Sequence, residues 1–236
     1  IQQREGEINF GEIDVLVKDY LDKKKISLPS EVNKRILLIA EICRTKFDID
    51  GYDESNMGMH IADGTRRLFE SYINWLYEKE AKKVLSHNRL VDIEHEMELY
   101  KSLNDAMYDV CDSVAFCMGG SSGWGGSAQI HDLSLDYQKR MYQAIIGAKL
   151  EEKNELNVPL GLFDKECKTL NDNYEPYEDE QPKDVTHIVN RFKDAFHSWY
   201  AYRKSAAAGM KDKRFKREYE SITYSFARIY FLHLKN

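Results

Sequence analysis

The sequence contains no apolar run near the roughly 20 residues that a membrane-spanning helix requires. Its longest such run is the short stretch Ile36 to Ala40. Alternating runs of β-branched residues between turn formers, the pattern of half-buried strands, are also missing. These absences exclude a membrane span and disfavour a sheet, so the sequence predicts an all-α protein.

Metal-binding and nucleophilic motifs are absent too. The chain has no His-x3-His or paired Cys-x2-Cys spacing, so a zinc site has little support. Its densest group of candidate ligands is Glu94, His95, Glu96 and Glu98, in which only Glu94 and Glu98 share a helix face. The G-x-S-x-G elbow of a serine nucleophile does not occur either. We therefore expect no metal and no other cofactor.

The chain has no excess of positive charge: its formal net charge is −6 over 236 residues. An acidic protein gains nothing from a polyanionic partner, which disfavours nucleic acid and anionic membranes. A cationic protein partner suits this balance better. With 42% apolar and 12% aromatic residues, the chain has enough material to fill a core.

Cysteine use and the first residue bear on the compartment. The four cysteines, Cys43, Cys111, Cys117 and Cys167, could form two disulfides or remain buried thiols. The chain begins at Ile1 rather than methionine, as a processed protein does once its signal peptide has been removed, and as a trimmed chain also does.

Apolar residues recur at steps of three and four, which is the spacing of one helical face. Turn formers interrupt the pattern between Phe47 and His60, and no sustained period runs from Glu151 to Gln181. The pattern predicts six or more amphipathic helices packed as antiparallel helical hairpins, with the longest between Ile93 and Cys117. The expected helices lie at about 30–43, 63–86, 93–117, 132–150, 182–209 and 215–229.

A glycine-rich break separates two of these helices. Each glycine between Gly119 and Gly126 would cost about 1 kcal/mol inside a helix relative to alanine, so we expect the helix to stop and restart near Asp132. No strand precedes the glycines and no Lys-Ser/Thr pair follows them, which argues against a phosphate-binding loop. Trp124 has few local neighbours among these glycines, so it must dock onto the core or meet a partner.

The domain organisation has two interpretations. The whole chain 1–236 is expected to be one globular domain, and it could contain two hairpin units, 30–152 and 182–235, joined by an acidic loop 153–181. Segments 66–81 and 190–205 resemble each other and align the two tryptophans, Trp75 and Trp199. Duplication would explain this, but amphipathic helices also resemble one another by chance.

Arginine and histidine are paired twice near the C-terminus, as Arg191 with His197 and Arg228 with His233. The spacing resembles the active motif of helical HEPN-type ribonucleases, in which histidine would transfer protons and arginine would stabilise developing charge. The alternative is structural, because His233 continues an apolar stripe.

A second candidate surface combines aromatic and acidic residues. Aromatic side chains supply contact area and carboxylates steer a basic partner, so the acidic loop and Trp124 form a predicted binding surface. Pairing of this loop with the basic segment Arg203–Arg217 is the alternative. The predicted binding residues are Trp124, Tyr174, Glu175, Tyr177, Glu178 and Asp179.

Two segments carry a family resemblance. FKDAFHSWYAYRKSAAA (Phe192–Ala208) and FKREYESITYSFARIYFLHL (Phe215–Leu234) resemble paired helices of the LprI-type lysozyme inhibitor family, and Cys111, the Gly-Gly-Ser loop and Arg140 resemble an earlier copy. The cysteine that usually follows the Tyr-Arg pair is missing after Arg203. The resemblance implies an exported, periplasmic or extracellular binding protein for a cationic lysozyme, without enzymatic activity. A structural or scaffolding role is a further alternative.

Overall fold

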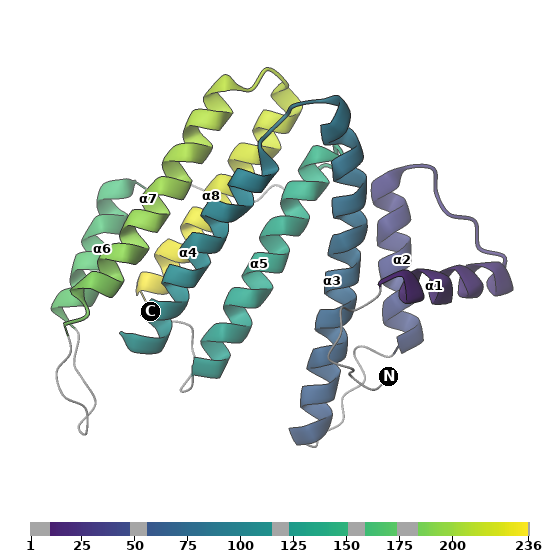
Figure 1. The fold of residues 1–236 in the computed structure, drawn as a ribbon, viewed down its shortest axis with the longest axis horizontal. Helices are drawn as coiled ribbons and strands as arrows, with labels where there is room; N and C mark the ends of the chain where they lie inside the picture. Colours follow the sequence, from purple (N-terminus) through teal and green to yellow (C-terminus); the bar gives the residue numbers. More distant parts are fainter. Residues whose placement is uncertain (1–9, 48–55, 115–122, 151–158, 174–183, 236) are drawn as a thin grey trace. The chain divides into compact units, whose positions relative to one another are not determined.

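A computed structural model describes residues 10–47, 56–114, 123–150, 159–173 and 184–235. These residues form eight α-helices and no strand, which confirms the all-α prediction (Figure 1). The chain divides into two compact units, Ile1–Lys82 and Lys83–Asn236.

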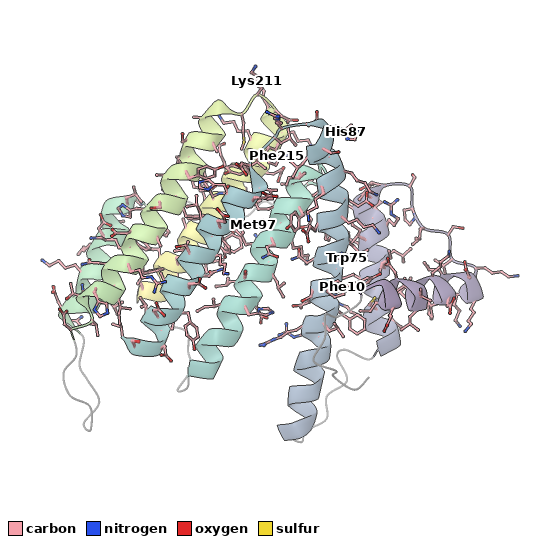
Figure 2. The ribbon with its side chains drawn as sticks, viewed as in Figure 1. Phe10, Trp75, His87, Met97, Lys211 and Phe215 are labelled. Atoms are coloured by element: carbon pink, nitrogen blue, oxygen red, sulfur yellow. The ribbon has the colours of Figure 1, made fainter. Side chains whose placement is uncertain are left out.

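The first unit holds α1 (Phe10–Lys24), α2 (Val32–Phe47) and most of α3 (Asn56–His87). Two buried tyrosines of α3 connect it to the other helices: the Tyr72 hydroxyl donates to Asp14 at 2.5 Å and the Tyr77 hydroxyl donates to Asn33 at 2.8 Å. Figure 2 labels Phe10 and Trp75, whose ring centroids lie 5.6 Å apart. Aromatic packing therefore holds α1 against α3.

The second unit contains α4 (Ile93–Ser113), α5 (Gly123–Ile145), α6 (Leu160–Asp172), α7 (Thr186–Gly209) and α8 (Lys213–Lys235). Helix α4 packs on α5 and α7, and α8 packs on α5 and α7, so these four helices form an antiparallel bundle (Figure 1). Helix α6 covers α7 and α8. The core lies between the four helices of the bundle.

Local sequence signals set several helix ends in this unit. The Asp92 side chain accepts a hydrogen bond from the backbone N–H of His95 and caps α4. Asp212 accepts from the N–H groups of Arg214 and Phe215 at the start of α8. Gly147, with φ +77°, follows α5 in the left-handed conformation that favours glycine at this position.

Helices were predicted in the right regions for α2, α3, α4, α5, α7 and α8, but several bounds were wrong. Helix α3 begins at Asn56, inside the expected loop, and it rather than α4 is the longest described helix, with 32 residues. Helix α5 begins at Gly123 rather than near Asp132, so Gly125 and Gly126 are helical. Helix propensity is a weak constraint that tertiary context often overrides, and the rest of α5 packs on α4 and α8.

Two helices were not predicted. Helix α1 buries Ile13, Val17 and Leu21 at steps of four. Helix α6 lies within the segment 153–181, which was wrongly expected to be an acidic loop throughout. Helices α4 and α5, which precede this segment, pack against α7 and α8, which follow it.

Helix α6 owes its stability to tertiary packing, because an isolated helix of 13 residues is marginal in water. It buries Phe163 and Cys167, which lie one turn apart. The Phe163 ring stacks on Phe196 of α7 with a centroid distance of 3.7 Å. This contact joins α6 to the core.

We expect Phe163→Ala to destabilise the second unit by about 3–5 kcal/mol, because it removes a fully buried ring and leaves a cavity. The measurement is the free energy of unfolding from urea denaturation followed by far-UV circular dichroism. Leu162→Ala is the matched control on the same helix, since Leu162 is 46% exposed. Equal losses for the two variants would contradict the packing of α6.

Candidate functional site

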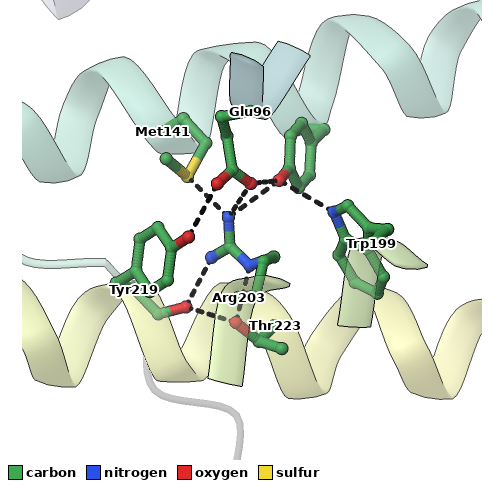
Figure 3. A network of polar contacts seen from close by, with 7 residues as sticks. Glu96, Met141, Trp199, Arg203, Tyr219 and Thr223 are labelled. Atoms are coloured by element: carbon green, nitrogen blue, oxygen red, sulfur yellow. Dashed lines mark hydrogen bonds and ion pairs between the residues drawn. The ribbon is translucent and has the colours of Figure 1, made fainter. Parts of the chain in front are cut away.

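A fully buried ion pair lies inside the four-helix bundle (Figure 3). Its members are Glu96 on α4 and Arg203 on α7, and neither side chain is exposed to solvent. A buried charge is costly unless it is paired and hydrogen-bonded. Arg203 Nη1 donates to Glu96 Oε1, so each charge compensates the other.

Neighbouring groups accept hydrogen bonds from all three nitrogens of the Arg203 side chain. Its Nε donates to Thr223 Oγ1 at 2.7 Å, its Nη2 donates to the Tyr219 carbonyl at 2.6 Å, and its Nη1 donates to the Tyr137 hydroxyl at 2.7 Å. The guanidinium also lies over the Tyr219 ring, with Cζ 3.6 Å from the centroid. The cation therefore has hydrogen-bond acceptors on α5 and α8 and an aromatic ring of α8 against it.

The carboxylate of Glu96 is equally well satisfied. The hydroxyls of Tyr137 and Tyr219 each donate to one of its oxygens, the second at 2.6 Å. Trp199 Nε1 donates in turn to the Tyr137 hydroxyl at 3.1 Å. The network thus joins α4, α5, α7 and α8 through side chains that all lie in the core (Figure 3).

The sequence explains why these charges are internal. On α7, Arg203 follows Phe196 and Trp199 at steps of three and four, so it lies on the buried stripe. On α4, Glu96 precedes Tyr100 and Leu103 at the same spacing. The sequence carried a signal for this pair that was not recognised. Each of the two helices has one charged residue within its apolar stripe. Arg203 had been assigned to the basic segment Arg203–Arg217, whereas it is a core residue.

The Glu96–Arg203 network organises the fold rather than contacting a ligand, because no solvent reaches either charged group. We expect Arg203→Met alone, or Glu96→Leu alone, to cost about 3–5 kcal/mol, since each leaves the other charge buried and unpaired. The double variant should lose at least about 2 kcal/mol less than the sum of the single losses. Urea denaturation of the four proteins measures this coupling. Additive losses would contradict the pairing.

Buried tyrosines give stability a specific pH dependence. Burial raises the pKa of Tyr100, Tyr137 and Tyr230 well above the ordinary value of 10.0. The unfolded chain loses these protons near pH 10, while the folded chain keeps them to higher pH. The stability that they contribute is therefore fully present below pH 10 and falls as the pH rises above it.

We expect cooperative alkaline unfolding, with each buried phenol lowering the free energy of unfolding by up to about 1.4 kcal/mol per pH unit above pH 10. An alkaline titration followed by tyrosinate absorbance and far-UV circular dichroism measures it. The buried phenols should ionise together with the loss of helix. Ionisation of all 15 tyrosines near pH 10 with intact helices would contradict this prediction.

An acidic groove lies on the outer side of α4, beside α5, with a volume of about 710 Å³. Helix α4 lines it with three exposed carboxylates, Glu94, Glu98 and Asp105, and with one cation, Lys101. These residues lie three or four positions apart and so share one face of the helix. Helix α5 contributes Ile130, His131, Ser134 and Gln138.

The groove also contains apolar and uncharged polar groups. Met97, labelled in Figure 2, and the 40% exposed Tyr108 supply apolar contact area. Asn104 lines the groove from a buried position next to Asp105. The groove thus combines negative charge with apolar contact area, which suits a cationic ligand.

A second hollow of about 1030 Å³ lies between the connection that precedes α4 and the turn between α7 and α8. Its charges balance, since two cations and two anions line it: Arg89, Lys211, Asp92 and Asp212. Both aspartates already cap helices. This hollow therefore offers no net charge with which to select a ligand.

Arg191 and His197 both belong to α7, but their side chains pair with carboxylates on two different helices. Arg191 pairs with Asp109 of α4, whereas His197 Nε2 lies 2.7 Å from Asp164 of α6. Arg228 is exposed on α8. His233 also belongs to α8, but its side chain lies outside the described residues.

The predicted binding residues fall outside the described part of the chain. Tyr174, Glu175, Tyr177, Glu178 and Asp179 belong to the segment 174–183, which the structure does not describe. Trp124 lies in the first turn of α5, and its side chain is likewise not described.

Cysteines and other potential ligands give no second site in the described residues. Cys43, Cys111 and Cys167 are buried thiols, and burial raises the pKa of Cys167 to about 12. No group of His, Cys, Asp and Glu side chains in the described segments could hold a metal ion. None of the described helices is long and apolar enough to span a bilayer.

Comparisons with protein-family models, curated proteins and solved structures gave no match to this chain. The resemblance to the lysozyme inhibitor family therefore stays a prediction.

Proposed function

We propose that the protein is an exported, non-enzymatic binding protein that receives a basic region of a cationic protein partner in the groove between α4 and α5. A lysozyme is the first candidate partner, on the strength of the family resemblance in Phe192–Ala208. Neither nucleic acid nor an anionic membrane suits the acidic groove.

One observation carries the proposal: Glu94, Glu98 and Asp105 line the groove against the single cation Lys101. Carboxylates arranged in this way steer a cationic partner toward the groove and repel anionic ones. Among the described residues, Glu94 and Asp105 make no ion pair. Glu98 pairs only with His95 there, whose Nδ1 lies 3.8 Å from Glu98 Oε2. These carboxylates are therefore available to a partner.

The ribonuclease alternative has less support. Its chemistry requires arginine and histidine side chains in one accessible groove, but Arg191 and His197 each pair with a carboxylate on a different helix. A scaffolding protein would also use the buried Glu96–Arg203 pair, but it would not need the exposed carboxylates of the groove.

We expect the protein to bind lysozyme, and the triple variant Glu94→Gln/Glu98→Gln/Asp105→Asn to bind it about tenfold more weakly. Isothermal titration calorimetry measures the affinity, and a cell-wall clearing assay measures inhibition. Binding should weaken between about 0.01 M and about 0.15 M salt, where the Debye length falls from about 30 Å to about 8 Å.

The matched control is Asp112→Asn/Asp172→Asn/Asp194→Asn, which neutralises three exposed aspartates that do not line the groove. Both triple variants change the formal net charge from −6 to −3. A loss confined to the groove variant supports the proposal. Equal losses would indicate that net charge alone attracts lysozyme, and no binding at low salt would reject lysozyme as the partner.

A further inference from the structure

Helix α6 makes few buried contacts for its length. Only Phe163 and Cys167 of its 13 residues are buried, whereas α4 buries eight residues of 21 and α7 buries seven of 24. It lies at the edge of the second unit, where it packs on α7 and α8 (Figure 1). Segments with few buried contacts open at a lower free energy than the core of the same protein. Helix α6 is therefore the element of this unit that we expect to open first.

The four-helix bundle does not need α6 for its buried polar groups. The hydrogen bonds around the Glu96–Arg203 pair come from α4, α5, α7 and α8, and none of them involves α6. What α6 covers is aromatic, since the Phe163 ring packs on Phe192 and Phe196 of α7. Detachment of α6 would expose these rings without removing any partner of the ion pair.

One hydrogen bond joins a side chain of α6 to another helix in the described part of the chain. His197 Nε2 of α7 lies 2.7 Å from Asp164 Oδ1, where its N–H can donate to the carboxylate. The two side chains are 36% and 43% exposed, so water weakens this contact without abolishing it.

A second polar group of α6 opposes docking. Asn171 follows Phe163 and Cys167 at steps of four, so it lies on the face that α6 turns toward the bundle. Its Oδ1 is buried and has no hydrogen-bond partner among the described residues. A buried acceptor without a partner is destabilising, and detachment would return this one to water.

We infer that α6 is a strap that opens while the four-helix bundle stays folded, and that the hydrogen bond between Asp164 and His197 holds it closed. Opening uncovers the aromatic face of α7 around Phe196 and the thiol of Cys167. The inference goes beyond the proposed function and does not depend on it, because the residues that line the acidic groove belong to α4 and α5.

The thiol of Cys167 reports the opening. It is 2% exposed, and burial raises its pKa to about 12, so a thiol reagent modifies it only when α6 detaches. The measurement is the rate of modification by N-ethylmaleimide at pH 7 in increasing urea, followed by mass spectrometry of the peptide that contains Cys167. We expect this rate to rise with urea much less steeply than global unfolding measured by far-UV circular dichroism, because opening of one helix exposes less surface.

Variants of the hydrogen bond provide the second measurement. Asp164→Ala and His197→Ala should each speed the modification of Cys167 about threefold, because each removes the same contact. The double variant should react no faster than the faster of the two single variants. Asp172→Ala is the matched control, at an exposed position in the last turn of the same helix. It should not raise the rate, since an aspartate near a helix C-terminus opposes the helix dipole.

Two results would overturn the inference. If Cys167 stays protected until the whole unit unfolds, with the urea dependence of global unfolding, α6 does not open separately. If Asp172→Ala speeds modification as much as Asp164→Ala does, or if the effects of Asp164→Ala and His197→Ala add up in the double variant, the hydrogen bond does not hold α6 closed. Lysozyme binding by the groove is measured separately and is not affected by either result.

Discussion

The ion pair between Glu96 and Arg203 is the constraint on which the second unit depends. Two charges without access to water can persist only if every donor and acceptor around them is satisfied, and this requires groups from α4, α5, α7 and α8 in a single arrangement. Apolar side chains could pack in several registers. The network admits few, because a shift of one helix turn would leave a charge unpaired.

This constraint also positions the groove. Glu96 lies between Glu94 and Glu98 in the sequence, yet it points into the core while its neighbours line the outer side of α4. Alternate acidic residues of one helix thus serve different purposes, since the buried one fixes the rotation of α4 and the exposed ones supply the charge of the groove. The rotation of the helix about its axis decides which carboxylates a partner can reach.

Helical periodicity predicted the fold class and the approximate positions of most helices, because long amphipathic patterns such as that of α4 are hard to mistake. Short helices such as α6 were missed because their stability comes from packing, here of Phe163 on Phe196, rather than from their own sequence. The groove could not be predicted, since it depends on which face of α4 is opposite α5. The buried charges could have been found, because Glu96 and Arg203 interrupt apolar stripes.

Asn104 extends the polar interior of the bundle beyond the Glu96–Arg203 network. Its carbonyl oxygen accepts a hydrogen bond from the Tyr230 hydroxyl of α8, and its amide lowers the pKa of the buried Tyr100 against the larger effect of burial. The buried phenols and the ion pair therefore lie on the same helices, so the loss of either set of interactions acts on the same bundle.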